Sequence, residues 1–576
     1  MAKKEQLFRD YYAANIRFLD PELVDRLKSI EPHSLTLMGT AYGPSILMKG
    51  LLLHSLDDPR GEAREFISGY RLEPGTLTIV LGLGLGYHIF ELYSQLGTRG
   101  KIVVIEESLS IFKMALELQN LITILTAKNI ELIVGLNKEE VIGRLRVTIG
   151  LDKIGQVKVI AYPPSFQLSP EYYGYLRRTI EGGLEARLAN LTTQALYGEM
   201  WLRNILLNLA QIINHPPVDA LYGKFSGKPA IIISAGPSLD KNIKCLNMAK
   251  GRALLMSVDT ALRPMLSKGI KPDLIVSVDP QEVKYAHIEG LKTKGMHLVA
   301  DGIASFLVFA SFEGKKLIAG HGHPLMNWIY SYLEFGELKT EPLRTGGSVA
   351  TAAFDLARKI GTDPIILVGQ DLSFPIIDQF HAGDVAFLGE RHDKLNKSNA
   401  FLTKDIFGRD VFTTRRLVSC QRWFEEEVRH TQAKCINATE GGILKQGFIQ
   451  MDLDEAIRTY CKVEIDIEGF LSQAQDYYPR VDRVGLRRGM EDMRDELIFL
   501  RGLCQEAIEA IDSGDNKLDR INREINDLGV TRLIKETIEG ILWQSSKDTN
   551  IKSFYKQVSE MSNRMERLVE EVVREL

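Results

Sequence analysis

The chain has 576 residues, a length that one hydrophobic core seldom organises, so we expect several domains. Hydrophobic residues make up 45% and charged residues 25% of the sequence, which is typical of a globular protein and argues against extended disorder. The net charge of -4 provides no basic field for a phosphate backbone, so we do not expect a nucleic-acid-binding function.

The cysteines and the apolar runs bear on where the protein resides. The 5 cysteines are scattered without a C-x-x-C pair, which predicts buried thiols in a reducing compartment rather than a zinc site. The first twenty residues alternate charged and apolar side chains and lack the apolar core of a secretion signal. Apolar runs fall well short of the roughly 18 residues that a membrane span needs. We therefore expect a cytoplasmic protein with no membrane span.

A first alternation of strands and helices begins near residue 78. Buried strands are expected at 78–81, 101–105, 130–134 and 157–161. A glycine turn and a helix follow the first of them, which predicts a small Rossmann-like domain over residues 1–168.

The turn itself carries a ligand-binding pattern, with Gly82, Gly84 and Gly86 after the first strand and Glu106 at the end of the second. Glycines allow a ligand to approach the backbone, and an acidic residue at this position accepts hydrogen bonds from a ribose. The pattern fits a dinucleotide or S-adenosylmethionine site. It equally fits a turn that only joins a strand to a helix.

The rest of the chain divides into three further parts. Residues 169–217 have a helical pattern that ends at a Pro-Pro pair, which predicts a helical connector. Strands and helices alternate again over residues 218–451, which predicts a doubly wound parallel sheet. Apolar residues recur at three-and-four spacing over residues 452–576, which predicts an α-helical bundle. The expected fold class is thus α/β, with two Rossmann-like domains and a C-terminal helical bundle.

The central part opens with a strand that ends in Ala235-Gly236-Pro237-Ser238-Leu239. The Ala-Gly pair lies where the chain must turn closely under a ligand. Ser238 is expected to cap a helix over residues 238–250, and a capped helix start attracts phosphate.

Two later strands of this part end in the same way, in Ser-Val-Asp. Asp259 is followed by Thr260, and Asp279 is followed by a proline. Because parallel strands meet at one edge of a sheet, the two carboxylates should lie at the edge where α/β folds bind ligands. Either aspartate alone is equally well explained as a turn or helix cap.

A second anion cradle is expected at Thr345-Gly346-Gly347-Ser348, which opens a helix whose first turn exposes peptide N–H groups. The next strand closes with Gly369, Asp371 and Ser373, and His381 follows ten residues after Asp371.

The order of these motifs, A-G-P-S-L-D, S-V-D-T-A, S-V-D-P, T-G-G-S-V-A and V-G-Q-D-L-S-F, resembles the central domain of the motility-associated factor (Maf) family of flagellin glycosyltransferases. The resemblance covers residues 229–373. The same core is similar to bacterial sialyltransferases that use CMP-sialic acid. The Rossmann-like N-terminal domain and the helical C-terminal domain are also what the Maf resemblance implies.

This resemblance implies a protein O-glycosyltransferase needed for flagellar assembly and motility. The donor would be a CMP-activated nonulosonic acid of the pseudaminic or legionaminic type, and the acceptor a Ser or Thr hydroxyl of flagellin. The reaction would be inverting, with CMP as the leaving group and no obligatory metal, although Asp259 and Asp279 leave room for a divalent cation. Ala235 and Asp259 stand where the sialyltransferases have asparagines, which leaves the recognition of cytosine and ribose open.

The general base is expected to be His381, which follows the sheet edge in a glycine-rich segment, as the base of similar sialyltransferases does. Asp371 is a second choice. The pair His321 and His323 is a third, although it also reads as the end of a strand that enters a turn.

Two other functions stay open. The G-P-S-L-D core is also similar to archaeal-type 6-hydroxymethylpterin diphosphokinases, which would imply an ATP-dependent transferase with Mg²⁺ on Asp259 and Asp279. The second alternative is a non-catalytic chaperone that binds flagellin. The flanking domains favour a transferase that holds a protein acceptor over a pterin enzyme.

Overall fold

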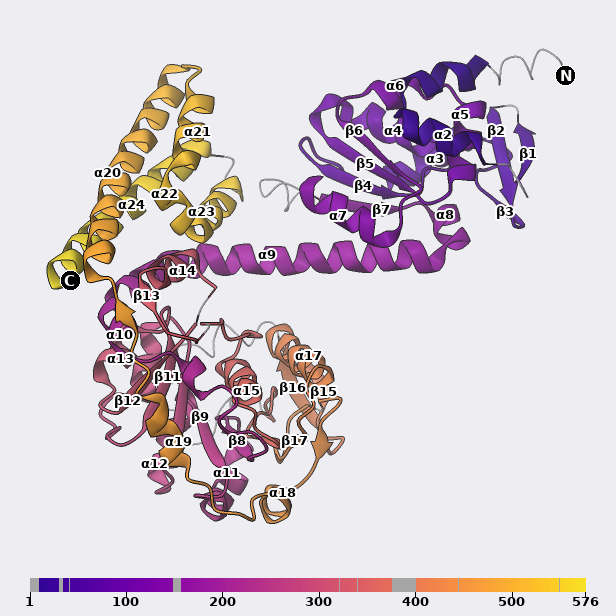
Figure 1. The fold of residues 1–576 in the computed structure, drawn as a ribbon. Coiled ribbons are helices and arrows are strands. Elements are labelled where there is room, and N and C mark those ends of the chain that lie inside the picture. The colour runs from indigo at the N-terminus through magenta and orange to yellow at the C-terminus, as the bar shows by residue number, and fades with distance from the viewer. Residues whose placement is uncertain are drawn as a thin grey trace. The chain divides into compact units, whose positions relative to one another are not determined.

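The computed structural model describes residues 10–30, 35–40, 42–148, 157–320, 322–338, 340–375, 400–443, 445–547 and 550–576. The chain divides into two compact units (Figure 1). Unit 1 comprises residues 1–193 and 542–549, and unit 2 comprises residues 194–541 and 550–576.

Unit 1 contains a four-stranded parallel sheet in the order β6-β5-β4-β7. Its strands are β4 (Leu77–Leu81), β5 (Lys101–Glu106), β6 (Ile130–Val134) and β7 (Val157–Ala161). These four strands confirm the expected β-α alternation. The chain moves from β4 outward to β6 and then returns to the other side of β4, so a topological switch point lies between β4 and β7. Ligands bind at the carboxyl edge of such a point in open α/β sheets.

The two faces of this sheet are covered by different helices, which fill two separate cores (Figure 1). Val80 and Val104 pack on one side with side chains of α3, α4 and α5. Their neighbours Ile79 and Val103 pack on the other side with α7 and the start of α9. Successive side chains of a strand point to opposite faces, so strands buried on both faces read as the continuous apolar runs seen in the sequence.

The remaining elements of unit 1 surround this sheet. The helices are η1 (Ile16–Phe18), α2 (Pro21–Lys28), α3 (Pro59–Ser68), α4 (Tyr87–Leu96), η2 (Gly97–Arg99), α5 (Leu109–Leu118), α6 (Ile122–Thr126), α7 (Lys138–Thr148) and α8 (Pro163–Leu168). A small antiparallel sheet is formed by β1 (Leu35–Thr40), β2 (Gly43–Met48) and β3 (Leu51–Leu52). The sequence did not predict this sheet, because its strands are short and lack strict alternation.

Helix α9 (Pro170–Leu207) and helix α10 (Leu209–Asn214) occupy the segment expected to be a helical connector. The boundary between the two units falls between residues 193 and 194, within α9. Pro216 and Pro217 follow α10, where proline's missing N–H prevents the helix from continuing.

Unit 2 contains an eight-stranded sheet in the order β12-β11-β10-β9-β8-β14-β17-β18, with parallel pairing throughout. Its strands are β8 (Ala230–Ile233), β9 (Leu254–Val258), β10 (Leu274–Ser277), β11 (His297–Asp301), β12 (Lys315–Ala319), β14 (Ile365–Val368), β17 (Cys435–Asn437) and β18 (Ile449–Gln450). The chain runs from β8 to β12 on one side and then crosses to β14 on the other. The switch point of this sheet therefore lies between β8 and β14.

The helices and short elements between these strands are η4 (Val218–Leu221), α11 (Leu239–Asn242), η5 (Ile243–Ala249), α12 (Asp259–Ser267), η6 (Glu282–His287), α13 (Phe306–Ser311), α14 (Pro324–Tyr330), β13 (Leu333–Glu334) and α15 (Val349–Lys359). The prediction of a single helix over residues 238–250 is wrong in part. The segment forms only a four-residue α-helix and then a 3-10 helix.

A hairpin of β15 (Ala400–Lys404) and β16 (Asp410–Thr414) and the helix α17 (Arg415–Arg429) precede β17. Helices α18 (Leu453–Tyr460) and α19 (Ile467–Ala474) follow β18. Buried residues of both helices, such as Leu453 and Leu471, belong to the core of the large sheet, whereas the domain boundary expected from the sequence lies at residue 452.

The last part of the chain is helical, as its apolar spacing predicted. After β19 (Arg480–Val481), which pairs with β13, come α20 (Arg483–Ser513), α21 (Leu518–Asp527), α22 (Gly529–Leu533), α23 (Lys535–Lys547) and α24 (Ile551–Glu575). Helices α20 and α24 lie side by side (Figure 1). Among the described residues, no helix is both long and apolar enough to cross a membrane.

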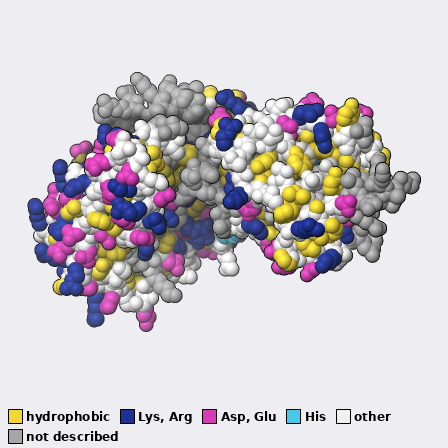
Figure 2. All heavy atoms as spheres, turned by 90° about the horizontal axis from the view of Figure 1, so that it is seen from above, with side chains coloured by type: hydrophobic (Ala, Val, Ile, Leu, Met, Phe, Trp, Pro, Cys, Tyr) yellow, Lys and Arg dark blue, Asp and Glu magenta, His cyan; other side chains and the backbone are white. Residues whose placement is uncertain are grey.

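The surface carries both signs of charge. Figure 2 shows Lys and Arg side chains interspersed with Asp and Glu side chains over the visible face. This mixture agrees with the small net charge, and it offers no broad single-sign field on that face.

Candidate functional site

The carboxyl edge of the large sheet brings together the turn after β8 and the turn after β14, at the switch point between these strands. The hydroxyl of Ser238 donates a hydrogen bond to Asp371 Oδ2 at 2.8 Å, and the Ser238 N–H contacts the same oxygen at 3.4 Å. Both residues are buried. Two motifs that are 133 residues apart in the sequence thus meet through one carboxylate.

Hydrogen bonds within the protein hold the G-P-S-L turn in place. Gly236 donates its N–H to the carbonyl of Gly369 at 2.8 Å, and Leu239 donates to the carbonyl of Gly236 at 3.0 Å. Ser238 makes no capping bond to the following helix, so the expected cap is wrong, and its hydroxyl binds Asp371 instead. Proline has no N–H. The peptide N–H groups of residues 236–239 are therefore used by the fold and do not form an open phosphate cradle.

Lys445 is a buried residue of this site that the sequence analysis missed. It is 1% exposed, and burial lowers the pKa of its amino group to about 8 although the nearby Asp371 and Glu425 carboxylates oppose the shift. Burial also raises the pKa of Asp371, while the Ser238 hydroxyl and Lys445 act to lower it. A buried amine and a buried carboxylate each favour the charged form of the other. Ionisable groups whose pKa values are perturbed in this way are candidates for a functional site.

A third loop, after β17, completes this edge. The N–H of Gln370 donates to the Thr439 hydroxyl at 3.2 Å, which links the loop to the turn after β14. A Cβ on Gly441 would touch the Asp371 carboxylate, and one on Gly442 would overlap the backbone of Asp371. The run Asn437-Ala-Thr-Glu-Gly-Gly442 directly after a short strand was the signal that could have revealed this loop.

The T-G-G-S motif lies at the start of α15, which packs on β8, β9 and β10. A crossover helix starts at the edge where strands end, so this helix start faces the same edge of the sheet. Ser348 caps the helix by accepting from the Ala350 N–H at 3.3 Å, so a helix does begin at the T-G-G-S motif. Within the described part of the chain, the N–H groups of Gly347, Ser348 and Val349 have no acceptor.

Helix α17 holds this loop in place. A Cβ on Gly346 would overlap the Trp423 ring, and Gly347 has a positive φ of 87° that disfavours other residues. Arg344 pairs with Glu427 at 2.6 Å, and Glu427 is almost fully buried. Thr345 is exposed beside these contacts. The loop is thus positioned by packing and by an ion pair, while its outer side stays open.

The two expected carboxylates do lie at neighbouring strand ends. Asp279 pairs with Lys284 at 3.6 Å, and Asp259 accepts from the N–H of Thr260 at 2.7 Å and from the Ser277 hydroxyl at 3.4 Å. Burial raises the pKa of Asp259, which Lys284 opposes and Asp279 reinforces.

The next strand, β11, ends on Asp301, a further buried carboxyl that the sequence analysis missed and whose pKa burial raises. Across the described ranges, no three His, Cys, Asp or Glu side chains stand together as a metal site.

The remaining expected site residues differ in where the structure places them. His381 and His321 lie outside the described residues. The Nδ1 of His323 accepts from the N–H of Leu325 at 3.1 Å and so caps α14, which favours the turn interpretation of this histidine. Ser373 is buried and its hydroxyl approaches the carbonyl of Asp371 at 3.4 Å, while Ala235 lies in the core. Gly369 has a φ of 65° and supports the turn that carries Asp371.

The glycine turn of unit 1 is closed by protein groups. The Leu83 N–H donates to Glu106 Oε2 at 2.8 Å, Gly84 donates to the same carboxylate, and Leu85 donates to His54 Nε2 at 2.9 Å. A Cβ on Gly82 would overlap Ser165. The close approach that the glycines permit is thus made by the chain itself, which agrees with a structural turn.

Comparisons with known proteins agree with this fold. A sequence-family profile described as 6-hydroxymethylpterin diphosphokinase MptE-like matches residues 203–376. An uncharacterised protein of Treponema pallidum (strain Nichols) is 26% identical over 253 residues, which are 43% of this chain and 85% of that protein. A second uncharacterised protein of this organism is 34% identical over 116 residues, which are 18% of this chain and 53% of that protein.

The solved structure of the MAf glycosyltransferase from Magnetospirillum magneticum AMB-1 is similar along nearly the whole chain. It has a TM-score of 0.64 and covers 98% of this chain and 96% of its own, at 15% sequence identity. At that identity the likeness concerns the fold alone. This chain therefore has the fold of that glycosyltransferase, which confirms the mixed α/β architecture that the alternation of strands and helices predicted.

Proposed function

We propose that the protein is a glycosyltransferase that moves a nonulosonic acid from a CMP-activated donor to a Ser or Thr hydroxyl of flagellin. The observation that carries the proposal is the meeting of three loops at the switch point of the large sheet, around the buried Asp371 and Lys445. The fold likeness to a MAf glycosyltransferase and the motif order in residues 229–373 support the choice of reaction.

The chemistry requires a place for the leaving nucleotide phosphate and a base for the acceptor hydroxyl. The start of α15 offers peptide N–H groups and the positive end of a helix dipole, so it is the phosphate site of this proposal. The G-P-S-L turn then acts as a positioning element that orients Asp371 through Ser238. His381 remains the proposed base, with Asp371 as the alternative.

The first test needs no sugar. Purified full-length protein is heated with CMP and, separately, with ATP and Mg²⁺, because a ligand at a hundred times its Kd adds about 2.7 kcal/mol of stability. A higher unfolding temperature with CMP alone supports the transferase. Stabilisation by neither ligand contradicts it and favours the chaperone.

The second test is transfer itself, measured by intact mass of flagellin after incubation with CMP-pseudaminic or CMP-legionaminic acid. His381→Ala should lower the rate by about a hundredfold or more, since a general base contributes roughly 10²–10⁴. Flagellin capture by this variant should be unchanged. Transfer at the wild-type rate would remove His381 from the mechanism, and the same assay on Asp371→Asn would then decide whether Asp371 is the base.

A second candidate function is an ATP-dependent diphosphokinase that acts on a pterin. The match of the MptE-like profile over residues 203–376 and the neighbouring carboxyls Asp259 and Asp279 favour it. Here Asp259 and Asp279 would hold Mg²⁺, which would neutralise negative charge on the nucleotide phosphates. Stabilisation by ATP and Mg²⁺ but not by CMP would select this function.

A further inference from the structure

Gln370 lies between Gly369 and Asp371, at the switch point of the large sheet, and the sequence analysis did not select it. The strand that precedes it, β14, is fully buried, whereas Gln370 keeps 6% of its surface exposed. Ser234, the first residue after the neighbouring strand β8, keeps 7%. These two side chains are therefore among the groups at the carboxyl edge that a bound ligand can contact.

Two neighbouring loops hold Gln370 in one orientation. The Ser234 hydroxyl donates to the side-chain oxygen Oε1 of Gln370 at 2.6 Å. The backbone N–H of Gln370 donates to the Thr439 hydroxyl, in the loop after β17, at 3.2 Å. Because one bond fixes the backbone and the other fixes the side-chain amide, the fold sets the direction in which the amide nitrogen points.

The amide nitrogen of Gln370 is the part of this side chain that the fold does not use. Nε2 can donate hydrogen bonds, yet it donates to no acceptor in the part of the chain that the structure describes. It is not among the unsatisfied side-chain atoms that are sealed from solvent, so it retains accessible surface. An unpaired donor in a largely buried position costs free energy, and an acceptor on a ligand can satisfy a donor that is both fixed and accessible.

The charges around Gln370 favour a neutral donor at this position. The adjacent Asp371 carboxylate accepts from the Ser238 hydroxyl at 2.8 Å, and Lys445 is buried near it. A further lysine or arginine would add a buried charge that needs its own partner. The amide of Gln370 can bind a carbonyl or carboxylate oxygen without adding such a charge.

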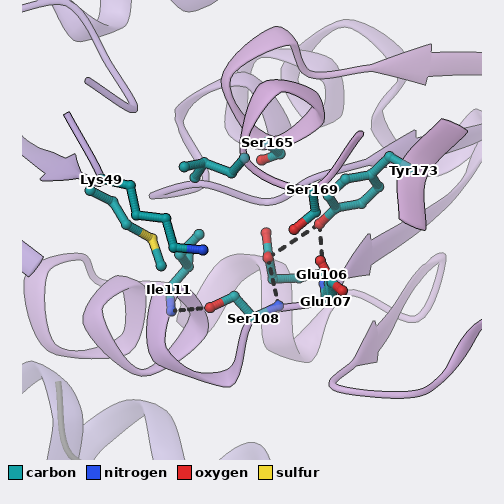
Figure 3. A pocket seen from close by; sticks show the side chains of 10 residues that line it. Lys49, Glu106, Glu107, Ser108, Ile111, Ser165, Ser169 and Tyr173 are labelled. Carbon is teal, nitrogen blue, oxygen red and sulfur yellow. Dashed lines mark hydrogen bonds between the residues drawn. The ribbon is translucent and has the colours of Figure 1, made fainter. Parts of the chain in front are cut away.

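The carboxyl edge of the small sheet shows the opposite situation. A cavity of about 280 Å³ opens there, and Figure 3 shows the side chains that line it. The Glu106 carboxylate accepts from the Ser108 N–H at 2.9 Å and from the Tyr173 hydroxyl at 3.3 Å. The Ser108 hydroxyl in turn accepts from the Ile111 N–H at 3.2 Å. The fold already uses these lining groups, whereas it leaves Gln370 Nε2 free for a ligand.

We propose that Gln370 is a specificity-determining residue of the donor site, which donates from its amide N–H to an acceptor oxygen of the CMP-activated sugar. Ser234 is the positioning residue that holds this amide. The inference rests on the proposed glycosyltransferase function. The oxygen belongs either to the cytosine carbonyl of the nucleotide or to the carboxylate of the nonulosonic acid. Both are acceptors without a proton, and the binding experiment separates them.

The test is isothermal titration of the full-length protein with CMP and, separately, with CMP-pseudaminic or CMP-legionaminic acid, whichever binds more tightly to the wild type. Gln370→Glu and Gln370→Met both remove the N–H donors, and only the first adds a charge. We expect both variants to bind the activated sugar at least about tenfold more weakly than the wild type. An equal loss for CMP places the oxygen on the nucleotide, and unchanged CMP binding places it on the sugar.

Gln473→Glu is the matched control for the change from amide to carboxylate. Gln473 is exposed on α19, and Glu468 and Ser472 of this helix contact Lys315 at the start of β12, so it lies at the opposite edge of the sheet. This variant should keep both wild-type affinities.

The role of Ser234 is tested by removing and restoring its hydroxyl. Ser234→Ala keeps the Gln370 donor but frees its amide, so it should weaken the same compound by about threefold to tenfold. Ser234→Thr keeps a hydroxyl and should restore the binding, which a loss of packing alone would not explain. This pair also decides the question if a Gln370 variant does not fold, since wild-type affinity in Ser234→Ala would contradict the inference.

Three results with the glutamine variants would overturn the inference. Wild-type affinity for both compounds in Gln370→Met would show that the donor is not used. A loss confined to Gln370→Glu would assign the effect to the added charge. An equal loss in Gln473→Glu would assign it to a general effect of charge. Failure of the wild-type protein to bind either compound would contradict the proposed function itself, so the two failures are distinguishable.

Discussion

At the scale of single residues, the candidate site depends on charges that are buried before any ligand arrives. Asp371 sits against Ser238 and near Lys445, and each of these three side chains is at most 6% exposed. Charges removed from water are tolerated only when partners compensate them. This is why the pH behaviour of the site should be visible in the stability of the protein as well as in its activity.

The Lys445→Met substitution should remove most of the pH dependence that Lys445 gives to the free energy of unfolding. The pKa of Lys445 is about 8 in the folded protein and 10.5 in its ordinary state, so the unfolded chain binds more protons between these values. The lysine therefore makes the wild-type protein more stable as pH rises from 8 to 10.5, by up to about 3 kcal/mol. Urea unfolding at pH 7.5 and 10 should show this rise in wild type and lose most of it in the variant.

Lys241→Met is the control for this experiment, because Lys241 is an exposed lysine of the same unit whose amino group donates to the Glu440 carbonyl. It should keep the wild-type pH dependence. An unchanged pH dependence in Lys445→Met would mean that Lys445 does not titrate as its burial implies.

His88 should make unit 1 sensitive to acid. It is fully buried, its Nε2 lies 3.0 Å from the carbonyl of Gly82, and burial lowers its pKa to about 3. Below pH 6.5 His88 is protonated in the unfolded chain but stays neutral in the folded protein. The free energy of unfolding therefore falls as the pH drops towards 3. The expected slope is about 1.4 kcal/mol per pH unit for this group.

The measurement is hydrogen exchange of peptides within residues 77–96 at pH 6.5 and pH 5, corrected for intrinsic rates. His88→Phe keeps the stacking on Tyr162 but loses the bond to Gly82, so it should be less protected at pH 6.5 and show a flatter acid response. His54, whose pKa is also lowered by burial, accounts for the slope that remains. An equal slope in variant and wild type would contradict this assignment.

At the scale of elements, short loops at the ends of parallel strands do most of the positioning. Three of them meet in unit 2 because β8, β14 and β17 are neighbours in the sheet, although they are far apart in the sequence. The start of α15 is fixed to the same edge by α17 through Trp423 and by the Arg344–Glu427 pair. Among the described residues, the N–H groups of Gly347, Ser348 and Val349 at this helix start have no acceptor, whereas those of the G-P-S-L turn are used by the fold, which is why the proposal places the phosphate at T-G-G-S.

Ser348→Ala should test this helix start. Loss of an N-cap hydroxyl costs about 1 kcal/mol of stability, and it leaves the Ala350 N–H without its acceptor. The same cost is expected from Thr414→Ala, which removes the cap of α17, where Thr414 accepts from Leu417 at 3.3 Å. Urea unfolding should give similar losses for both variants, while only Ser348→Ala should weaken CMP binding by calorimetry. Equal CMP affinity in the two variants would argue against a phosphate at α15.

At the scale of the whole molecule, the chain carries two parallel sheets, each with its own switch point and its own core. At the carboxyl edge of each sheet a buried carboxyl group is hydrogen-bonded by residues far away in the sequence, Glu106 in unit 1 and Asp371 in unit 2. The proposed site for the nucleotide-activated donor lies at the carboxyl edge in unit 2.

The effects of CMP should therefore be confined to unit 2. CMP should slow hydrogen exchange in peptides covering residues 345–351 and 437–445, and leave peptides covering residues 101–111 unchanged. Protection by CMP across both units would contradict a site confined to unit 2 and would point to a coupling between the units.

The sequence alone determined the β-α alternation of both sheets. Runs such as Ile231-Ile-Ile and Ile102-Val-Val-Ile are buried on both faces of their sheets. A continuous apolar run in the sequence is enough to predict such a strand. It also identified Asp371, Asp259, Asp279 and Ser348 at strand or helix ends, because a motif at the end of a parallel strand has a known edge. The T-G-G-S helix start followed from local geometry in the same way.

Tertiary structure decided which of these groups are free. The glycine turn and the G-P-S-L turn both look like open cradles in the sequence, yet Glu106, His54 and Asp371 occupy them from distant parts of the chain. The same long-range packing placed Lys445 beside Asp371 and left Ser165 without a partner. Hydrogen bonds between residues far apart in the sequence depend on how the sheets are ordered, and no local pattern encodes that order.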